Sequence, residues 1–158
     1  MSFKKAVTKT PHLENAWKPG LRALRAQDRP HLEPEDTQLL RGSVDVDSAL
    51  QGEQANAHRW DFAIGYRHAN WQKDFVYWVE VHTANDKEVK VVLNKLRWLK
   101  NWLVGEGKFL NAFKRDFVWV SSDATTFTLD APQSKQFAQL GLLHKGRVLR
   151  IPSVRPNP

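Results

Sequence analysis

The sequence predicts an α/β fold, with a mixed β-sheet of about five strands flanked by helices. Short stretches with the hydrophobic pattern of strands occupy residues 43–47, 59–66, 75–82, 116–121 and 146–151. A long stretch with helical periodicity separates the third of them from the fourth, and a shorter one separates the fourth from the fifth. The first three predicted strands have connections short enough for antiparallel neighbours, whereas the later strands require helical crossovers.

Length and composition predict a single soluble domain. The 158 residues match the usual size of one domain and are enough to bury a core without disulfide bonds. The chain has no cysteine, which excludes disulfide scaffolds, thiolate zinc sites and cysteine nucleophiles. No run approaches the roughly 18 apolar residues of a membrane span, and no apolar segment follows Lys4 and Lys5 as in a secretory signal. We therefore expect a cytoplasmic protein with no membrane partner.

Proline and glycine divide the chain into an arm, a domain and a tail. Residues 1–20 contain Pro11, Pro19 and Gly20 with little periodicity, which predicts an extended N-terminal arm. Residues 21–151 form the predicted α/β domain, which begins with short helices over residues 21–27 and 33–40. Residues 152–158 contain three prolines and predict a flexible C-terminal tail.

Two of the predicted strands are clear from their patterns. Residues 59–66 alternate, which places Trp60, Phe62, Ile64 and Tyr66 on one face and Asp61 on the other. Residues 75–82 are apolar on both faces until their last positions, and this pattern indicates a central strand covered on both sides.

The long helical stretch is the clearest element of the chain. Asn85 is a suitable N-cap, Glu88 completes a capping-box-like pair, and Gly105 ends the helix. Residues 132–143 predict a further helix. The apolar face of the long helix is formed by Val89, Val92, Leu93, Leu96, Leu99 and Leu103, and its other faces carry Lys87, Lys90, Lys95, Arg97 and Lys100.

The net charge of +7 favours a polyanionic partner, and its distribution is uneven. Residues 31–61 hold seven acidic and two basic residues, whereas residues 85–115 hold eight basic and three acidic residues. A metal-dependent enzyme that acts on phosphates needs such a distribution, although an ordinary basic protein with one acidic loop has it too. We predict nucleic acid, either DNA or RNA, as the partner, bound by the helical side chains of Lys87, Lys90, Lys95 and Arg97.

Two acidic residues are predicted to converge. Asp61 lies at the start of one predicted strand and Glu80 at the end of the next, so an antiparallel pairing brings them to the same end of the sheet. Directly opposed residues on one face lie within about 5 Å of each other. Two carboxylates at that distance repel each other unless a cation lies between them, and oxygen ligands suit Mg²⁺ or Mn²⁺. The N-terminus of the long helix follows closely and favours phosphate.

These residues and the order of the elements resemble the PD-(D/E)xK nuclease superfamily, which has a restriction-endonuclease-like sandwich fold. The resemblance covers residues 31–151 and is carried by Trp60-Asp61-Phe62 and Glu80-Val81-His82. It implies that Asp61 and Glu80 bind Mg²⁺ or Mn²⁺, that the carbonyl of Val81 adds a ligand, and that Glu35 reaches the metal directly or through water.

The sequence departs from the family pattern at position 82, where His82 replaces the usual lysine. A neutral imidazole can accept a proton from water, and a protonated one can face the developing phosphate charge. Lys87 or Lys90 is a candidate for the missing ammonium. Asp61, Glu80, His82 and Lys87 are therefore the candidate catalytic residues of a Mg-dependent nuclease.

Each candidate also has a structural interpretation. Asp61 can pair with neighbouring Arg59, His82 can be a satisfied histidine, Glu35 can complement its helix dipole, and the helix lysines can form a solvated face. Two non-catalytic functions therefore stay open on the same fold. One is a nucleic-acid-binding module, and the other is a protein-interaction domain or homodimer that uses a tryptophan-rich surface near Trp98 and Trp102.

Overall fold

The computed structural model describes residues 1–71, 73–123 and 127–152. Within these residues, a six-stranded sheet has the order β1-β3-β4-β5-β6-β7, and β2 and β8 form a separate pair. The strands of the large sheet are β1 (Trp17–Lys18), β3 (Leu40–Asp45), β4 (Phe62–Tyr66), β5 (Phe75–His82), β6 (Lys114–Ser121) and β7 (Leu142–His144), and those of the pair are β2 (Leu32–Pro34) and β8 (Leu149–Ile151). The helices are α1 (Phe3–Lys9), α2 (Val46–Leu50), α3 (Asp86–Val104), α4 (Lys108–Asn111) and α5 (Ala131–Leu140), with 3₁₀ turns at Arg29–His31 and Thr37–Leu39.

The sheet is mixed, as the connections predict. Neighbouring strands from β1 to β5 are antiparallel. The chain then crosses through α3 to β6, which is parallel to β5, and through α5 to β7, which is parallel to β6. The predicted α/β class with a mixed sheet flanked by helices is therefore confirmed.

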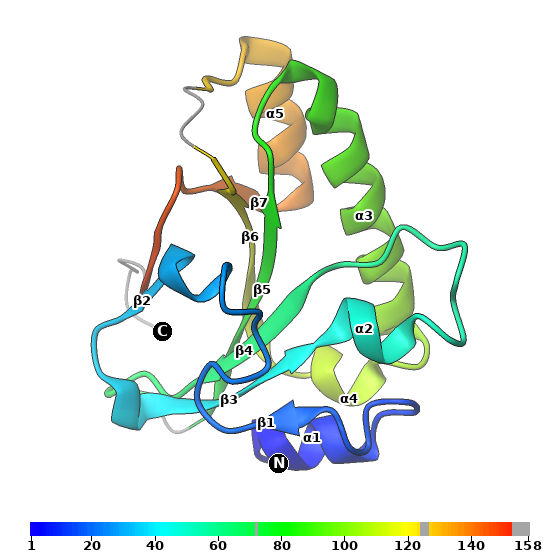
Figure 1. Ribbon diagram of the computed structural model, residues 1–158, viewed down its shortest axis with the longest axis vertical. Coiled ribbons are helices and arrows are strands. Elements are labelled where there is room, and N and C mark those ends of the chain that lie inside the picture. The colour runs from blue at the N-terminus through cyan, green and yellow to red at the C-terminus, as the bar shows by residue number, and fades with distance from the viewer. Residues whose placement is uncertain (72, 124–126, 153–158) are drawn as a thin grey trace.

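Helix α3 covers one face of this sheet and has the bounds that its caps predict. The side chain of Asn85 accepts a hydrogen bond from the backbone N–H of Glu88, and the helix ends before Gly105. Its predicted apolar residues are all buried against the sheet. Figure 1 shows α3 and α5 on one side of the central strands and the β2–β8 pair on the other.

Alternate residues of β4 and β5 contribute to two hydrophobic cores. Ala63 and Trp78 pack into the core beneath α1, α3 and α4, whereas Phe62 and Tyr77 belong to the core on the opposite face. Trp60 lies in the first core with Trp78, not with Phe62 as the alternation predicts. The reason is that β4 begins only at Phe62, so the two-residue period does not extend back to position 60.

The prediction of an extended N-terminal arm is wrong. Residues 3–9 form α1, and Phe3 is fully buried with Ala6 and Val7. The backbone N–H of Phe3 donates to Oδ2 of the buried Asp74, at 2.9 Å. The ring of Phe3 lies on Gly65, where a Cβ would be 2.5 Å from it, so this contact requires glycine. A helix of about two turns carries too short a pattern to be recognised without the surface that it covers.

Three further predicted elements differ from the structure. Residues 21–27 form turns, and residues 33–40 contain the end of β2 and a 3₁₀ turn in place of a helix. The predicted helix over residues 132–143 ends at Leu140, because Gly141 adopts a left-handed conformation with φ of 71°.

The last predicted strand also differs. Of residues 146–151 only Leu149–Ile151 form a strand, and this strand pairs with β2, so β7 is the last strand of the large sheet. The predicted tail lies, from residue 153 on, outside the described residues. No helix in the described part of the chain is both long enough and apolar enough to cross a membrane.

Candidate functional site

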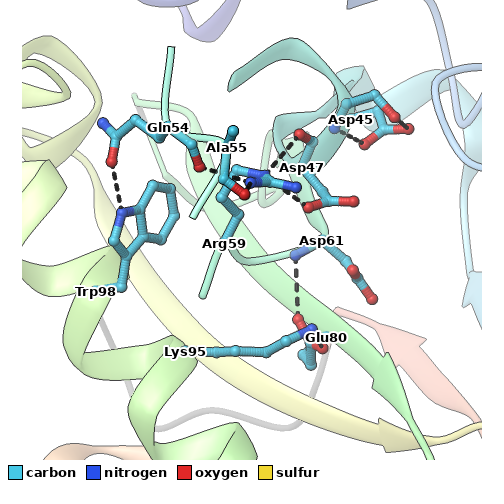
Figure 2. A network of polar contacts seen from close by, with 10 residues as sticks. Asp45, Asp47, Gln54, Ala55, Arg59, Asp61, Glu80, Lys95 and Trp98 are labelled. Carbon is cyan, nitrogen blue, oxygen red and sulfur yellow. Dashed lines mark hydrogen bonds and ion pairs between the residues drawn. The ribbon is translucent and has the colours of Figure 1, made fainter. Parts of the chain in front are cut away.

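The strand pairing brings Asp61 and Glu80 together. Phe62 pairs with Val79, so the preceding Asp61 lies opposite Glu80. The backbone N–H of Asp61 donates to Oε1 of Glu80 at 3.1 Å, and the N–H of Val81 donates to Oδ2 of Asp61 at 3.0 Å. Each strand thus holds the carboxyl group of the other. Figure 2 shows the bond from Asp61 to Glu80. The predicted convergence of the two acids is present in the structure.

Both carboxyl groups lie on the face of the sheet that α3 covers. Trp78 packs into the core beneath α3, and Glu80 shares its face because side chains alternate along β5. The carboxyl group of Asp61 lies near enough to Lys95 of α3 to be affected by its charge. Glu80 is 0% exposed and Asp61 is 8% exposed. Burial of two acids beside each other is costly, because each charge loses its hydration and repels the other.

A lysine of α3 reaches this pair from above the sheet. Nζ of Lys95 lies 2.5 Å from Oε2 of Glu80, and its side chain is 19% exposed (Figure 2). Burial opposes the charge of Lys95, but the attraction of Glu80 and Asp61 outweighs burial and raises the pKa of Lys95 above its ordinary value. The lysine is therefore charged at neutral pH and donates a hydrogen bond to Glu80.

The pKa values of both acids are raised. Burial raises the pKa of Asp61 from 3.8 to about 6, against the attraction of Lys95 and the hydrogen bond from Val81. Burial and the charge of Asp61 raise the pKa of Glu80 well above its ordinary value, and Lys95 offsets this only in part. When both acids are ionised, two negative charges face one positive charge. The cluster then has an excess negative charge that a bound cation could neutralise.

Arg59 does not pair with Asp61. Its Nε lies 2.9 Å from Oδ1 of Asp47, and its Nη1 donates to the carbonyl of Gln54 at 2.6 Å. The side-chain oxygen of Gln54 in turn accepts a hydrogen bond from Nε1 of Trp98 on α3, at 2.8 Å. These contacts attach the connection between α2 and β4 to α3, beside the acidic pair (Figure 2). The charge of Asp47 also contributes to the raised pKa of Asp61.

His82 also lies beside Glu80. Its Nδ1 is 3.7 Å from Oε2 of Glu80, and its Nε2 is 2.8 Å from Oε2 of Glu88 on the first turn of α3. The histidine therefore reaches the site, as predicted, and has a partner of its own in Glu88. Position 82 faces the same carboxylate oxygen that Lys95 contacts.

Glu35 is not brought to Asp61 and Glu80. Its backbone N–H donates to the carbonyl of Ile151. Burial raises the pKa of Tyr66, and the charges of Asp36 and Glu35 raise it further, so Glu35 lies near the end of β4 opposite to Asp61. The helix predicted to carry Glu35 is absent, because this segment turns away to pair with β8.

The other basic residues of α3 point away from the acidic pair. Successive helical residues are rotated by about 100°, so Lys87 lies about 80° from Lys95 around the axis, Lys90 about 140° and Arg97 about 160°. Lys87, Lys90 and Arg97 are exposed, whereas Lys95 is half-buried. Among these four predicted phosphate-binding side chains, Lys95 forms the ion pair with Glu80.

The sequence contains a signal that distinguishes Lys95. It has Val91 and Val92 one turn before it and Leu99 one turn after it, so it lies at the border of the apolar face. Lys90 has Asp86 and Lys87 one turn before it and therefore lies among polar residues. A lysine with apolar neighbours on both sides must direct its ammonium to a partner at the edge of the core.

The predicted tryptophan-rich surface is smaller than the sequence indicates. Trp60, Trp78 and Trp119 are fully buried, and Trp102 is 5% exposed. Trp98 is partly buried and stacks on Trp102 with ring centroids 6.0 Å apart. Because its N–H is bonded to Gln54, Trp98 attaches a neighbouring connection to α3.

Among the described residues, no group of three or more acidic or histidine side chains is arranged as a metal site. The carboxylates that meet here are the two of Asp61 and Glu80. No family model matches the sequence, and comparisons with curated proteins and with solved structures also find no match.

Proposed function

We propose that this chain is a Mg-dependent nuclease that hydrolyses phosphodiester bonds of nucleic acid, on a restriction-endonuclease-like fold of the PD-(D/E)xK superfamily. The observation that carries the proposal is the contact of Asp61, Glu80 and Lys95 at one end of β4 and β5. Two acids and one ammonium are the groups that the resemblance implies. In this proposal Lys95 of α3 takes the role that the family assigns to the residue at position 82.

The order of the elements supports the fold in this proposal. Three consecutive antiparallel strands, β3, β4 and β5, are followed by the crossover helix α3 and by β6, parallel to β5. This is the order that the sequence resemblance implies. Because the antiparallel pair places the start of β4 beside the end of β5, Asp61 and Glu80 meet at the end of the sheet from which α3 begins.

The donor atoms fit a divalent cation. Among the described residues, Oδ2 of Asp61 accepts a hydrogen bond from Val81 and no hydrogen bond reaches Oδ1, which leaves that atom for a ligand. Mg²⁺ and Mn²⁺ prefer carboxylate oxygens, and the excess negative charge of the cluster favours them. Asp61 and Glu80 would hold the ion. When bound, the ion would neutralise negative charge on the scissile phosphate and activate a water molecule.

Lys95 and His82 have separate roles in this proposal. The raised pKa of Lys95 keeps its ammonium protonated, so it stabilises negative charge that develops on the phosphate and does not act as a base. His82, held by Glu88, helps to position the carboxylate of Glu80. The N–H of Val81 orients Asp61, so the backbone of β5 contributes to the site through its donor group.

The test is cleavage of plasmid DNA, single-stranded DNA and RNA with and without Mg²⁺ or Mn²⁺. We expect metal-dependent cleavage that falls by at least about a hundredfold in Asp61→Asn, Glu80→Gln and Lys95→Met. Glu35→Gln is the matched control, because this exposed acid lies at the far end of β4 and should leave cleavage unchanged. Cleavage that survives in Asp61→Asn would overturn the proposal.

A second candidate is a nucleic-acid-binding module without catalysis. The observation that favours it is the 2.5 Å contact between Lys95 and Glu80, because an internal ammonium already compensates the buried acid without any metal. Binding of nucleic acid that resists EDTA and weakens with salt, together with no cleavage under any metal, would support this second candidate.

A further inference from the structure

A groove of about 660 Å³ lies at the opposite end of the sheet from Asp61 and Glu80. It is lined by the connection between β4 and β5, by α4 and by the start of β6. Phe75 pairs with Lys114 at this end, whereas Glu80 pairs with Trp119 at the other. Phe75 and Glu80 are five positions apart along β5, which corresponds to about 17 Å. The groove is therefore distinct from the candidate active site.

The groove is strongly basic. Lys73, Lys108 and Lys114 line it, and Lys9 of α1 lies next to it, with Nζ 5.9 Å from the ring centroid of Phe109. The acidic residue of the lining is Asp74, whose side chain is 1% exposed and bonded to Arg67 at 2.8 Å. Its charge is thus compensated inside the protein. Four ammonium groups surround the groove, and they complement a ligand with several negative charges.

Two aromatic rings of the groove have faces that cations can reach. Nζ of Lys114 lies 5.0 Å from the ring centroid of Trp71, and Nζ of Lys108 lies 5.5 Å from that of Phe109. A ring face occupied by a lysine from the surface is not covered by the core, so a flat ligand can replace the lysine there. Nucleobases stack on such faces, while the displaced ammonium groups can bind phosphates.

We propose that this groove binds single-stranded nucleic acid, with bases on Trp71 and Phe109 and phosphates at the surrounding lysines. The positive charge of four ammonium groups is larger than the negative charge of one nucleotide. It corresponds to the charge of several consecutive phosphates, so the occupant is a strand. The inference goes beyond the proposed hydrolysis and is independent of it, because none of the groove residues contacts Asp61, Glu80 or Lys95 among the described contacts.

The test is fluorescence anisotropy of a short labelled oligothymidylate with the full chain in EDTA, which excludes metal-dependent cleavage. We expect Lys108→Ala/Lys114→Ala to raise the Kd by roughly tenfold or more and to reduce its dependence on salt. Phe109→Ala should weaken binding by roughly 5- to 150-fold, the range for loss of one base stack. Trp71→Leu is a second variant of the same test, because it removes the stacking ring of Trp71 but keeps apolar volume beside Phe75.

The comparison variant is Lys90→Ala/Arg97→Ala, which removes the same charge from the exposed face of α3. Equal losses in the two double variants would overturn the proposal, because they would indicate a general electrostatic attraction. A larger loss in the α3 variant, or no binding by the unmodified chain, would overturn it as well. A mononucleotide can be added as a competitor at the same concentration of phosphate groups as the strand. If it displaces the labelled strand, the groove binds nucleotides and not a strand.

Discussion

Nζ of Lys95 lies 2.5 Å from Oε2 of Glu80, although fifteen residues separate them in the chain. The contact forms because α3 begins four residues after β5 and runs back over the sheet, which places the third turn of the helix above the end of the strand. A fully buried acid thus receives its counter-charge from a crossover helix.

Removal of the ammonium should destabilise the protein. Lys95→Met leaves Glu80 buried beside Asp61 without a positive partner, so we expect the free energy of unfolding at pH 8 to fall by about 3–5 kcal/mol. Urea denaturation measures this change. The double variant Glu80→Gln/Lys95→Met should regain much of the loss, because it removes the charge that was left unpaired. Additive losses in the double variant would contradict a direct interaction.

Asp61→Asn should stabilise the protein at neutral pH. The pKa of Asp61 is raised from 3.8 to about 6, so between these values the folded state binds the proton more tightly than the unfolded state. The stabilisation that this proton provides is complete below pH 3.8 and is lost as the pH rises through 6. Asparagine stays neutral and can still accept the hydrogen bond from Val81.

The expected gain in the free energy of unfolding is as much as about 3 kcal/mol at pH 7 and close to zero at pH 4. Urea denaturation at the two pH values measures it. The matched control is Asp74→Asn, because Asp74 is also buried but is paired with Arg67 and Phe3. That variant should lose stability at pH 7. A loss in both variants would mean that Asp61 is a structural acid like Asp74.

Metal binding should depend on pH around the pKa of Asp61. A carboxyl group binds Mn²⁺ or Mg²⁺ in its ionised form, and Asp61 is protonated below about pH 6. We expect the affinity for Mn²⁺ to fall by about tenfold for each pH unit below 6 and to become nearly constant above the range in which both acids ionise. Isothermal titration calorimetry in two buffers with different ionisation enthalpies measures both the affinity and the released protons. An affinity that is unchanged between pH 5 and 7 would contradict the assignment.

A lysine introduced at position 82 should replace Lys95. Position 82 faces the same oxygen of Glu80, since Nδ1 of His82 lies 3.7 Å from Oε2. We expect His82→Gln to lower metal-dependent cleavage by less than about tenfold, because His82 positions the acid and does not supply the fixed charge. His82→Lys should restore part of the cleavage that Lys95→Met removes. Failure of this rescue in a folded double variant would show that the helix position itself is required.

The packing of α1 on the sheet can be tested apart from function. Gly65→Ala places a methyl group 2.5 Å from the ring of Phe3, so we expect a loss of about 1–3 kcal/mol in the free energy of unfolding. Phe3→Ala leaves a cavity in the same place and should cost about 3–5 kcal/mol. Chemical denaturation measures both losses. Unchanged stability in both variants would indicate that residues 3–9 do not belong to the core.

Several features followed from the sequence because they depend on residues that are close together in the chain. The alternation in residues 75–82, the Asn85 cap and the apolar face of α3 are local patterns, and the structure reproduces them. The approach of Asp61 to Glu80 also follows, because a hairpin with a short connection forces the start of one strand beside the end of the next. For the same reason the mixed sheet was predictable from the lengths of its connections.

The tertiary structure alone decided the features that depend on distant contacts. The pairing of β2 with β8 joins segments more than a hundred residues apart and moves Glu35 away from the acids. The choice of Lys95 over Lys87 and Lys90 depends on the rotation of α3, which the burial of its whole apolar face determines. Likewise, the basic groove exists because α4, the start of β6 and the β4–β5 connection meet at one end of the sheet. Periodicity within a segment specifies which face is buried, but the partner of each face is selected by packing of the complete core.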